Sequence, residues 1–256
     1  GHAYSFHGIT GSLGWALAPA MLVPLTVAFS WRVALVAAGV LAFGVLAVLL
    51  ANRSHLHLKV EAPAKGAAAQ DSSFGFLKIP AVWMCFAFFF WYAIALGVVQ
   101  AFAPEAARPL HDMPIALVAS CLTIYMLCSA GGMVLGGFLV SDPTRCERIV
   151  GIGFGLAAGV ALLLALGTYP AWVVPVLFGL MGFASGMAGP SRDLLVKRST
   201  PDNASGRVYG VVYAGLDIGS AVSPLIFGLM MDAGQYRGVL LGLALVQGVL
   251  IDSAFN

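Results

Sequence analysis

The sequence predicts an all-α fold, a polytopic membrane helix bundle, on the grounds of composition, run length and side-chain periodicity. Apolar residues make up 60% of the 256 positions and charged residues only 9%, against roughly 25% charged in a soluble domain. Each apolar run is about as long as a membrane helix needs, and none alternates as barrel strands do. We expect eight spans, near 6–29, 33–51, 79–103, 115–140, 149–167, 171–189, 208–230 and 238–255.

The basic residues predict which loops face the cytoplasm. Lys and Arg collect in cytoplasmic loops, and ten of the thirteen lie in loops 52–78, 141–148 and 190–207. The opposite loops hold only the remaining three, which are Arg32, Arg108 and Arg237. We therefore expect a multi-pass protein of the cell (inner) membrane, with both ends of this chain in the cytoplasm.

Several classes of site have no support in the sequence. The net charge of +2 is too small and too dispersed for a nucleic-acid surface. The four cysteines show no C-x-x-C spacing, and the pair His55 and His57 has no third ligand nearby, so we expect no metal and no cofactor. All five histidines lie near termini or in loops, and neither G-x-S-x-G nor an ATP-binding P-loop occurs. We therefore expect no enzyme.

The sequence repeats itself at an offset of 205 residues, so the first two spans correspond to the last two. Residues 1–51 would then be the last two helices of an amino-terminal six-helix half, 52–78 a cytoplasmic linker and 79–256 the carboxy-terminal half. The expectation is an amino-terminally truncated fragment holding eight of twelve spans. Such repeats are typical of secondary transporters, which bind substrate between their halves. The identities at this offset are Tyr4 with Tyr209, Gly14 with Gly219, Pro19 with Pro224, Arg32 with Arg237 and Leu35 with Leu240.

Short motifs add a resemblance to a known family. The segments that carry it are Gly11–Pro19, Ser30–Arg32, Gly136–Arg145, Pro190–Asp193, Gly206–Gly210 and Gly215–Ser220. Together they resemble the fifth to twelfth helices of the major facilitator superfamily, over essentially the whole chain. The later segments are similar to those of proteobacterial members, some of which are drug or fosmidomycin-resistance exporters. The resemblance implies a secondary active transporter working by alternating access.

Asp217 is the one carboxylate deep inside a predicted span. It lies about 14 Å into span 208–230, near the midplane of the bilayer. An ionisable group at that depth usually faces a cavity or a partner, and burial would let it exchange a proton near neutral pH. The alternative is that Asp217 forms a hydrogen bond between helices and never titrates.

Four further side chains are candidates for the substrate cavity. Trp91, Tyr92 and Gln100 in span 79–103 combine flat apolar surface with an amide, which suits an organic solute. Tyr125 in span 115–140 offers the same chemistry. Aromatic residues also pack in cores and at membrane interfaces, and Gln100 lies late enough in its span to face outer water, so packing and rim positions stay open for these residues.

Charges at the cytoplasmic ends of the spans are candidates for a gate. The resemblance implies that Asp142 bridges to the start of span 208–230, where the helix dipole favours an anion. The other members of this candidate gate are Arg145, Arg148, Arg192 and Asp193. The alternative is that these are solvated charges that only set the orientation.

Small residues and prolines predict helix contacts and bends. Gly151, Gly155 and Gly159 recur every four residues, as do Gly182 and Gly186, a spacing that lets helices approach closely. The repeated element contributes Pro19, Gly219 and Pro224, at which a helix can bend or pack.

The predicted function is a secondary active transporter of a small organic solute, coupled to protons and with drug efflux as one form. Its expected partners are a small-molecule substrate, protons and the lipid bilayer, and the full-length protein is expected to be a monomer. Two alternatives remain. One is a multispan membrane enzyme or lipid-handling scaffold, and the other is a fragment that is inactive on its own.

Overall fold

The computed structural model describes residues 24–56, 79–139, 146–198 and 205–255, with residue 77 and scattered positions between 10 and 22. Throughout these residues the secondary structure is helical, without a strand, so the predicted all-α bundle is confirmed. The chain divides into two compact units, one holding residues 14–74 and the other residues 75–256 with 1–13. Each unit is described by itself below.

The smaller unit contains helix α2 (Trp31–Ala51) and a following 3-10 turn, η1 (Arg53–Leu56). The side chain of Ser30 caps the start of α2 by accepting a hydrogen bond from the Val33 N–H at 3.3 Å. The side chains of α2 are apolar on every face of the helix, a pattern typical of a membrane span rather than a surface helix. The segment predicted as a linker from residue 52 therefore starts with a short ordered turn.

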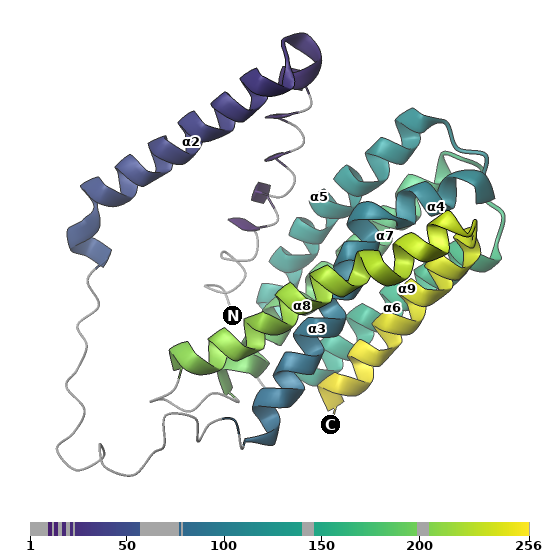
Figure 1. Cartoon of the computed structure of the whole chain (residues 1–256). Coiled ribbons are helices and arrows are strands. Elements are labelled where there is room, and N and C mark those ends of the chain that lie inside the picture. The colour runs from purple at the N-terminus through teal and green to yellow at the C-terminus, as the bar shows by residue number, and fades with distance from the viewer. Residues whose placement is uncertain are drawn as a thin grey trace. The chain divides into compact units, whose positions relative to one another are not determined.

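The larger unit is a bundle of six long helices and one short helix (Figure 1). Packing follows a chain in which α5 lies on α7, α7 on α6, α6 on α9, α9 on α3 and α3 on α8. The α4–α5, α6–α7 and α8–α9 turns gather at one end, which we call the short-turn end (Figure 1). The helices are α3 (Pro80–Ala101), α4 (Ala103–Leu110), α5 (Ile115–Leu139), α6 (Cys146–Leu166), α7 (Val173–Arg198), α8 (Ser205–Asp232) and α9 (Tyr236–Phe255).

The helix lengths agree with a membrane-spanning bundle. Among the described residues, six helices are long and apolar enough to cross a bilayer, namely α2, α3, α5, α6, α7 and α8. In α9 the apolar stretch Tyr236–Ile251 is shorter. Most predicted spans match their helices within three residues at each end, because the thickness of the hydrocarbon layer sets the length of an apolar run.

Two helical segments lie outside the predicted spans. The apolar segment of α7, Val173–Ser191, agrees with the predicted span 171–189, and the helix continues past it to Arg198, because Leu194, Leu195 and Val196 are followed by basic residues that favour a helix in water. Helix α4 lies between the predicted spans 79–103 and 115–140, in a stretch to which no element was assigned from the sequence. Pro104 lies in its first turn and Glu105 and Arg108 complement its dipole.

The repeat predicted from the sequence has a counterpart in helix register. Helix α2 begins at Trp31 and α9 begins at Tyr236, which are 205 positions apart. The helical residues before α2 extend to Ala28, and α8 extends to Asp232, which corresponds at this offset to residue 27. The two helix pairs therefore share the placement of their turns as well as the five identical residues.

Candidate functional site

Helix α8 is held against α3 through a face of small residues. A side chain added at Gly215 would meet the backbone of Phe86 and Phe90, and one added at Gly219 would meet the Phe90 carbonyl and Ala93. One turn further on, the Ser223 hydroxyl donates a hydrogen bond to the Ile94 carbonyl at 3.3 Å. Glycine at these positions brings the two backbones together, so the orientation of α8 about its own axis is fixed.

Asp217 lies on the side of α8 that points away from α3. Asp217 is two positions from Gly215 and two from Gly219, a rotation of about 200° around the helix. It is exposed and makes no hydrogen bond or ion pair with any residue that the structure describes. Counting from the bounds of α8 (Ser205–Asp232), Asp217 is about 18 Å from one end and about 22 Å from the other. The interhelical hydrogen bond considered as its alternative role is thus not present within the described bundle.

The aromatic candidates of α3 point in different directions. Trp91 packs edge-on against its neighbour Phe90, with the ring centroids 5.2 Å apart. Tyr92 packs edge-on against Phe154 of α6, at 6.2 Å. Both side chains are half-buried. Tyr92 therefore belongs to the interior of the bundle, while Trp91 lies among the aromatic side chains of its own helix.

A polar cluster links α3, α5 and α7 inside the bundle. Tyr125 is only 5% exposed, and its polar neighbours are Ser185 and, at longer range, Tyr92. The Ser185 oxygen is buried and has no hydrogen-bond partner of good geometry. Tyr92 and Tyr125, predicted separately, are thus brought together, and Ser185 joins them. We call these three residues the tyrosine cluster.

Two amides in the bundle also have unsatisfied atoms. The Nε2 atom of Gln100, in the last turn of α3, is buried without a partner. In α9, Gln247 is 1% exposed and its Oε1 atom has no partner. A buried amide without a partner is costly in lipid. Ser185 and Gln247 were not predicted, although each is an isolated hydroxyl or amide side chain in an apolar run, a pattern that can be recognised in the sequence.

The closest helix contact in the bundle is between α5 and α7. Side chains added at Gly132 or Gly136 of α5 would overlap the backbone of Phe183 and Met187, and those added at Gly182 or Gly186 of α7 would overlap the backbone of α5. The predicted packing role of Gly159 was wrong, since nothing lies within 4 Å of its added side chain, and Gly155 meets only Ile251. Gly153 makes the close contact of α6 instead, against Ala184 and Ala188.

The structure describes only some residues of the candidate gate. Arg148 is exposed in the first turn of α6, beside the exposed Glu147. Asp142, Arg145 and Pro19 lie outside the described residues. The backbone of Arg192 and Asp193 is part of α7, directly after Ser191 and the intrahelical Pro190. The side chains of these two residues lie outside the described part of the structure. Pro224 is exposed inside α8, which continues past it to Asp232.

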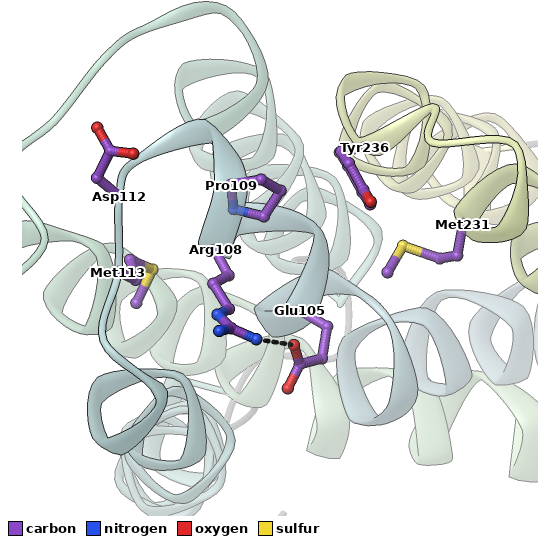
Figure 2. Close-up of a pocket in the computed structure, with 7 residues that line it drawn as sticks. All are labelled: Glu105, Arg108, Pro109, Asp112, Met113, Met231 and Tyr236. Carbon is purple, nitrogen blue, oxygen red and sulfur yellow. Dashed lines mark ion pairs between the residues drawn. The ribbon is translucent and has the colours of Figure 1, made fainter.

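A separate hollow of about 540 Å³ opens at the short-turn end (Figure 2). None of the predicted cavity residues lines it. Glu105 and Arg108 face each other at 4.0 Å and are both half-exposed, so their pairing contributes only about 0–1 kcal/mol. Met231 and Tyr236 complete the wall from α8 and α9. No three His, Cys, Asp or Glu residues of the described chain come together as a metal site requires.

Comparison with known proteins gives the family. The family model of the Major Facilitator Superfamily matches residues 1–191 and residues 113–251. Because the two matches overlap, residues 113–191 match it twice, as expected for a family built from related repeats. No curated protein and no solved structure matches the chain. The matches cover nearly the whole chain and the helices have the length of membrane spans, so the chain belongs to the Major Facilitator Superfamily, a family of membrane transporters.

Proposed function

We propose that the chain is the greater part of a proton-coupled secondary transporter that moves a small organic solute by alternating access. One observation carries the proposal, which is the position of Asp217. It is exposed near the middle of a membrane-spanning helix, on the side that α3 does not cover. A carboxylate facing lipid at that depth costs several kcal/mol. Water in a cavity, or another part of the transporter, must therefore face Asp217.

The same stripe of α8 carries two further polar side chains, Tyr213 and Ser220. Tyr213, Asp217, Ser220 and Pro224 are all exposed and follow one another at intervals of four, three and four residues, and the Tyr213 ring also packs against Phe89 of α3 at 5.3 Å. This spacing places them along one stripe of the helix. In the proposal the stripe lines the transport pathway, and Asp217 takes up a proton from one side of the membrane and releases it to the other.

Trp91, Tyr92, Gln100 and Tyr125 are proposed as the groups that recognise the solute. Their aromatic surfaces and amide suit an organic solute. On α8 the partly exposed Tyr213 ring lies one turn from the Asp217 carboxylate, and an aromatic face beside a carboxylate matches an aromatic organic cation. An exporter of such drug-like cations fits this chemistry. The loop charges Asp142, Arg145, Arg148, Arg192 and Asp193 are proposed as the cytoplasmic gate.

Transport in proteoliposomes tests the function. The protein that contains this chain would be reconstituted and supplied with ethidium, a flat aromatic cation, under an imposed pH gradient. We expect ethidium to accumulate against its gradient, and a protonophore to abolish that accumulation. Ethidium accumulation that does not depend on the pH gradient would contradict proton coupling. A panel of anionic and neutral solutes in the same vesicles tests the proposed positive charge of the substrate.

The proposed orientation places the loop around residue 199 in the cytoplasm, since the flanking segments carry Arg192, Lys197, Arg198 and Arg207. In a background without the four native cysteines, Ser199→Cys should resist a membrane-impermeant thiol reagent in intact cells and react after lysis. Thr168→Cys, in the α6–α7 turn, serves as the matched position on the other side. Labelling of Ser199→Cys in intact cells would reverse the topology.

A further inference from the structure

A buried histidine joins two turns at the short-turn end. His111 begins the α4–α5 turn and is 3% exposed. Its Nε2 atom lies 3.1 Å from the carbonyl of Leu164, in the last turn of α6. Its Nδ1 atom accepts a hydrogen bond from the backbone N–H of Tyr169, in the α6–α7 turn, at 3.3 Å. The Tyr169 ring lies beside the imidazole, with the centroids 5.8 Å apart.

Only one protonation state satisfies both contacts. An atom that accepts from an N–H must carry a lone pair, so Nδ1 is unprotonated. The Leu164 carbonyl can only accept, so Nε2 carries the proton. His111 is therefore neutral in this arrangement. If Nδ1 bound a second proton, its N–H would point at the N–H of Tyr169. The hydrogen bond between them would be lost, because both groups would then be donors.

The surroundings of His111 favour the neutral form. Burial lowers its pKa from the ordinary value of 6.5, the Leu164 carbonyl raises it in part and the positive charge of Arg237 on α9 lowers it further. In its own turn Asp112 is exposed, and on α4 Glu105 pairs with Arg108 at the hollow. The described parts of α5, α6 and α7 bring no charged side chain to this end, and Tyr169 is the titratable group of the α6–α7 turn.

We propose that His111 is a proton-sensitive latch that ties the α6–α7 turn to the α4–α5 turn. In neutral solution both hydrogen bonds form and the latch is closed. As the pH falls below about 6.5, the open state, in which the hydrogen bonds of His111 are broken, binds the extra proton more readily than the closed state. The stability that the latch contributes is therefore present above this pH and is lost on acidification. With the orientation proposed above, the latch responds to the pH outside the cell.

Amide hydrogen exchange of residues 167–172 tests the latch in the membrane-embedded protein. Rates would be measured by mass spectrometry at pH 7.5 and pH 5.0 and divided by the intrinsic rate of each amide at the same pH. We expect the protection of this turn to fall by about fivefold at pH 5.0, the factor that corresponds to a hydrogen bond worth about 1 kcal/mol. Protection that stays equal at the two pH values would overturn the proposal.

Two variants separate the latch from other titrating groups. His111→Gln offers one amide donor and one carbonyl acceptor, as the neutral imidazole does, but cannot be protonated. It should keep the protection of the turn and lose its pH dependence. Asp112→Asn, which removes the neighbouring exposed carboxylate and tolerates the left-handed conformation of that residue (φ 50°), should behave as the wild type. A pH response retained in His111→Gln would contradict the latch.

A spectroscopic measurement does not depend on a folded variant. Nitrogen-15 NMR of histidine-labelled protein distinguishes a protonated nitrogen from one that carries a lone pair. We expect one histidine with the proton on Nε2 at pH 7.5, and a transition below pH 6.5 to the doubly protonated form, together with faster exchange of residues 167–172. A doubly protonated buried histidine at pH 7.5, or titration without any change in the turn, would overturn the proposal.

Discussion

The two most closely packed helix pairs of the bundle, α5–α7 and α3–α8, reach backbone contact in different ways. Both bring backbones into contact through glycine. In α5–α7 the glycines come from both partners: Gly132 and Gly136 of α5 meet the backbone of α7, and Gly182 and Gly186 of α7 meet the backbone of α5. In α3–α8 the backbone contacts are made mainly by Gly215 and Gly219 of α8, and a hydrogen bond from Ser223 follows them.

The difference separates a structural contact from a functional helix. The described parts of α5 and of the apolar segment of α7 contain no charged residue, so this pair can form a fixed interface within the carboxy-terminal bundle. We call the packed interface of a helix pair its seam. Helix α8 buries its small residues on one side and carries Asp217 on the other. A helix held along one side only can change what covers its free side without breaking its own seam. We therefore expect steric changes to harm α5–α7 most, and charge changes to act at α8.

The largest effect on stability is expected at the α5–α7 seam. Gly182→Val would force a side chain into the Tyr125 carbonyl, and rigid backbone on both sides prevents relaxation. We expect a loss of about 3 kcal/mol or more in the free energy of unfolding, measured by thermal unfolding in detergent. Gly159→Val is the matched control, since nothing lies within 4 Å of that position. Equal stability of the two variants would show that the seam is not tightly packed.

A smaller loss is expected at the α3–α8 seam. Gly219→Ala adds one methyl group against the Phe90 carbonyl and the Ala93 side chain. We expect a cost of about 1–3 kcal/mol, because α8 can shift on its uncovered side. Gly210→Ala, on the same helix with open space around it, should be neutral or slightly stabilising, since alanine favours the helix. A greater loss at Gly219 than at Gly182 would reverse the ranking of the two seams.

The smallest effects are expected from two buried serines, one in each pair. Ser185→Ala removes a hydroxyl that lies near Tyr125 but makes no hydrogen bond of good geometry, and it should change stability by less than about 0.5 kcal/mol, or increase it. Ser223→Ala removes the donor to the Ile94 carbonyl and should cost about 1 kcal/mol. Unfolding midpoints of the two variants in the same detergent give the comparison. A larger cost for Ser185→Ala would mean that the tyrosine cluster depends on its hydroxyl.

The sequence predicted the membrane helices well because one physical quantity, the thickness of the apolar layer, determines their length. It failed where that quantity has no influence. Helix α4 is short, contains Pro104 and Pro109, and mixes the charges of Glu105 and Arg108 with small apolar residues. The last turns of α7 lie beyond its apolar segment, Val173–Ser191, where charge no longer stops a helix. Both depend on local backbone preferences that an apolar run does not reveal.

Contacts between distant residues were the least predictable part. A four-residue spacing pointed to Gly155 and Gly159, but a spacing does not say which neighbour a helix face meets, and Gly153 makes the contact. His111 was placed correctly in a turn, yet its partners Leu164 and Tyr169 are more than fifty residues away. Tyr92 and Tyr125 were each proposed from residue type, and only the fold shows that they are polar neighbours inside the bundle.

The most direct test is uphill transport by the Asp217→Asn variant, compared with exchange across the same vesicles. Asparagine keeps the shape of a neutral carboxyl but cannot release a proton. We expect Asp217→Asn to abolish accumulation driven by an imposed pH gradient while it still exchanges solute downhill, and Asp217→Glu to retain part of the accumulation. Asp232→Asn, at the end of the same helix, controls for loss of a charge. Wild-type accumulation by Asp217→Asn would contradict a proton-carrying role for this residue.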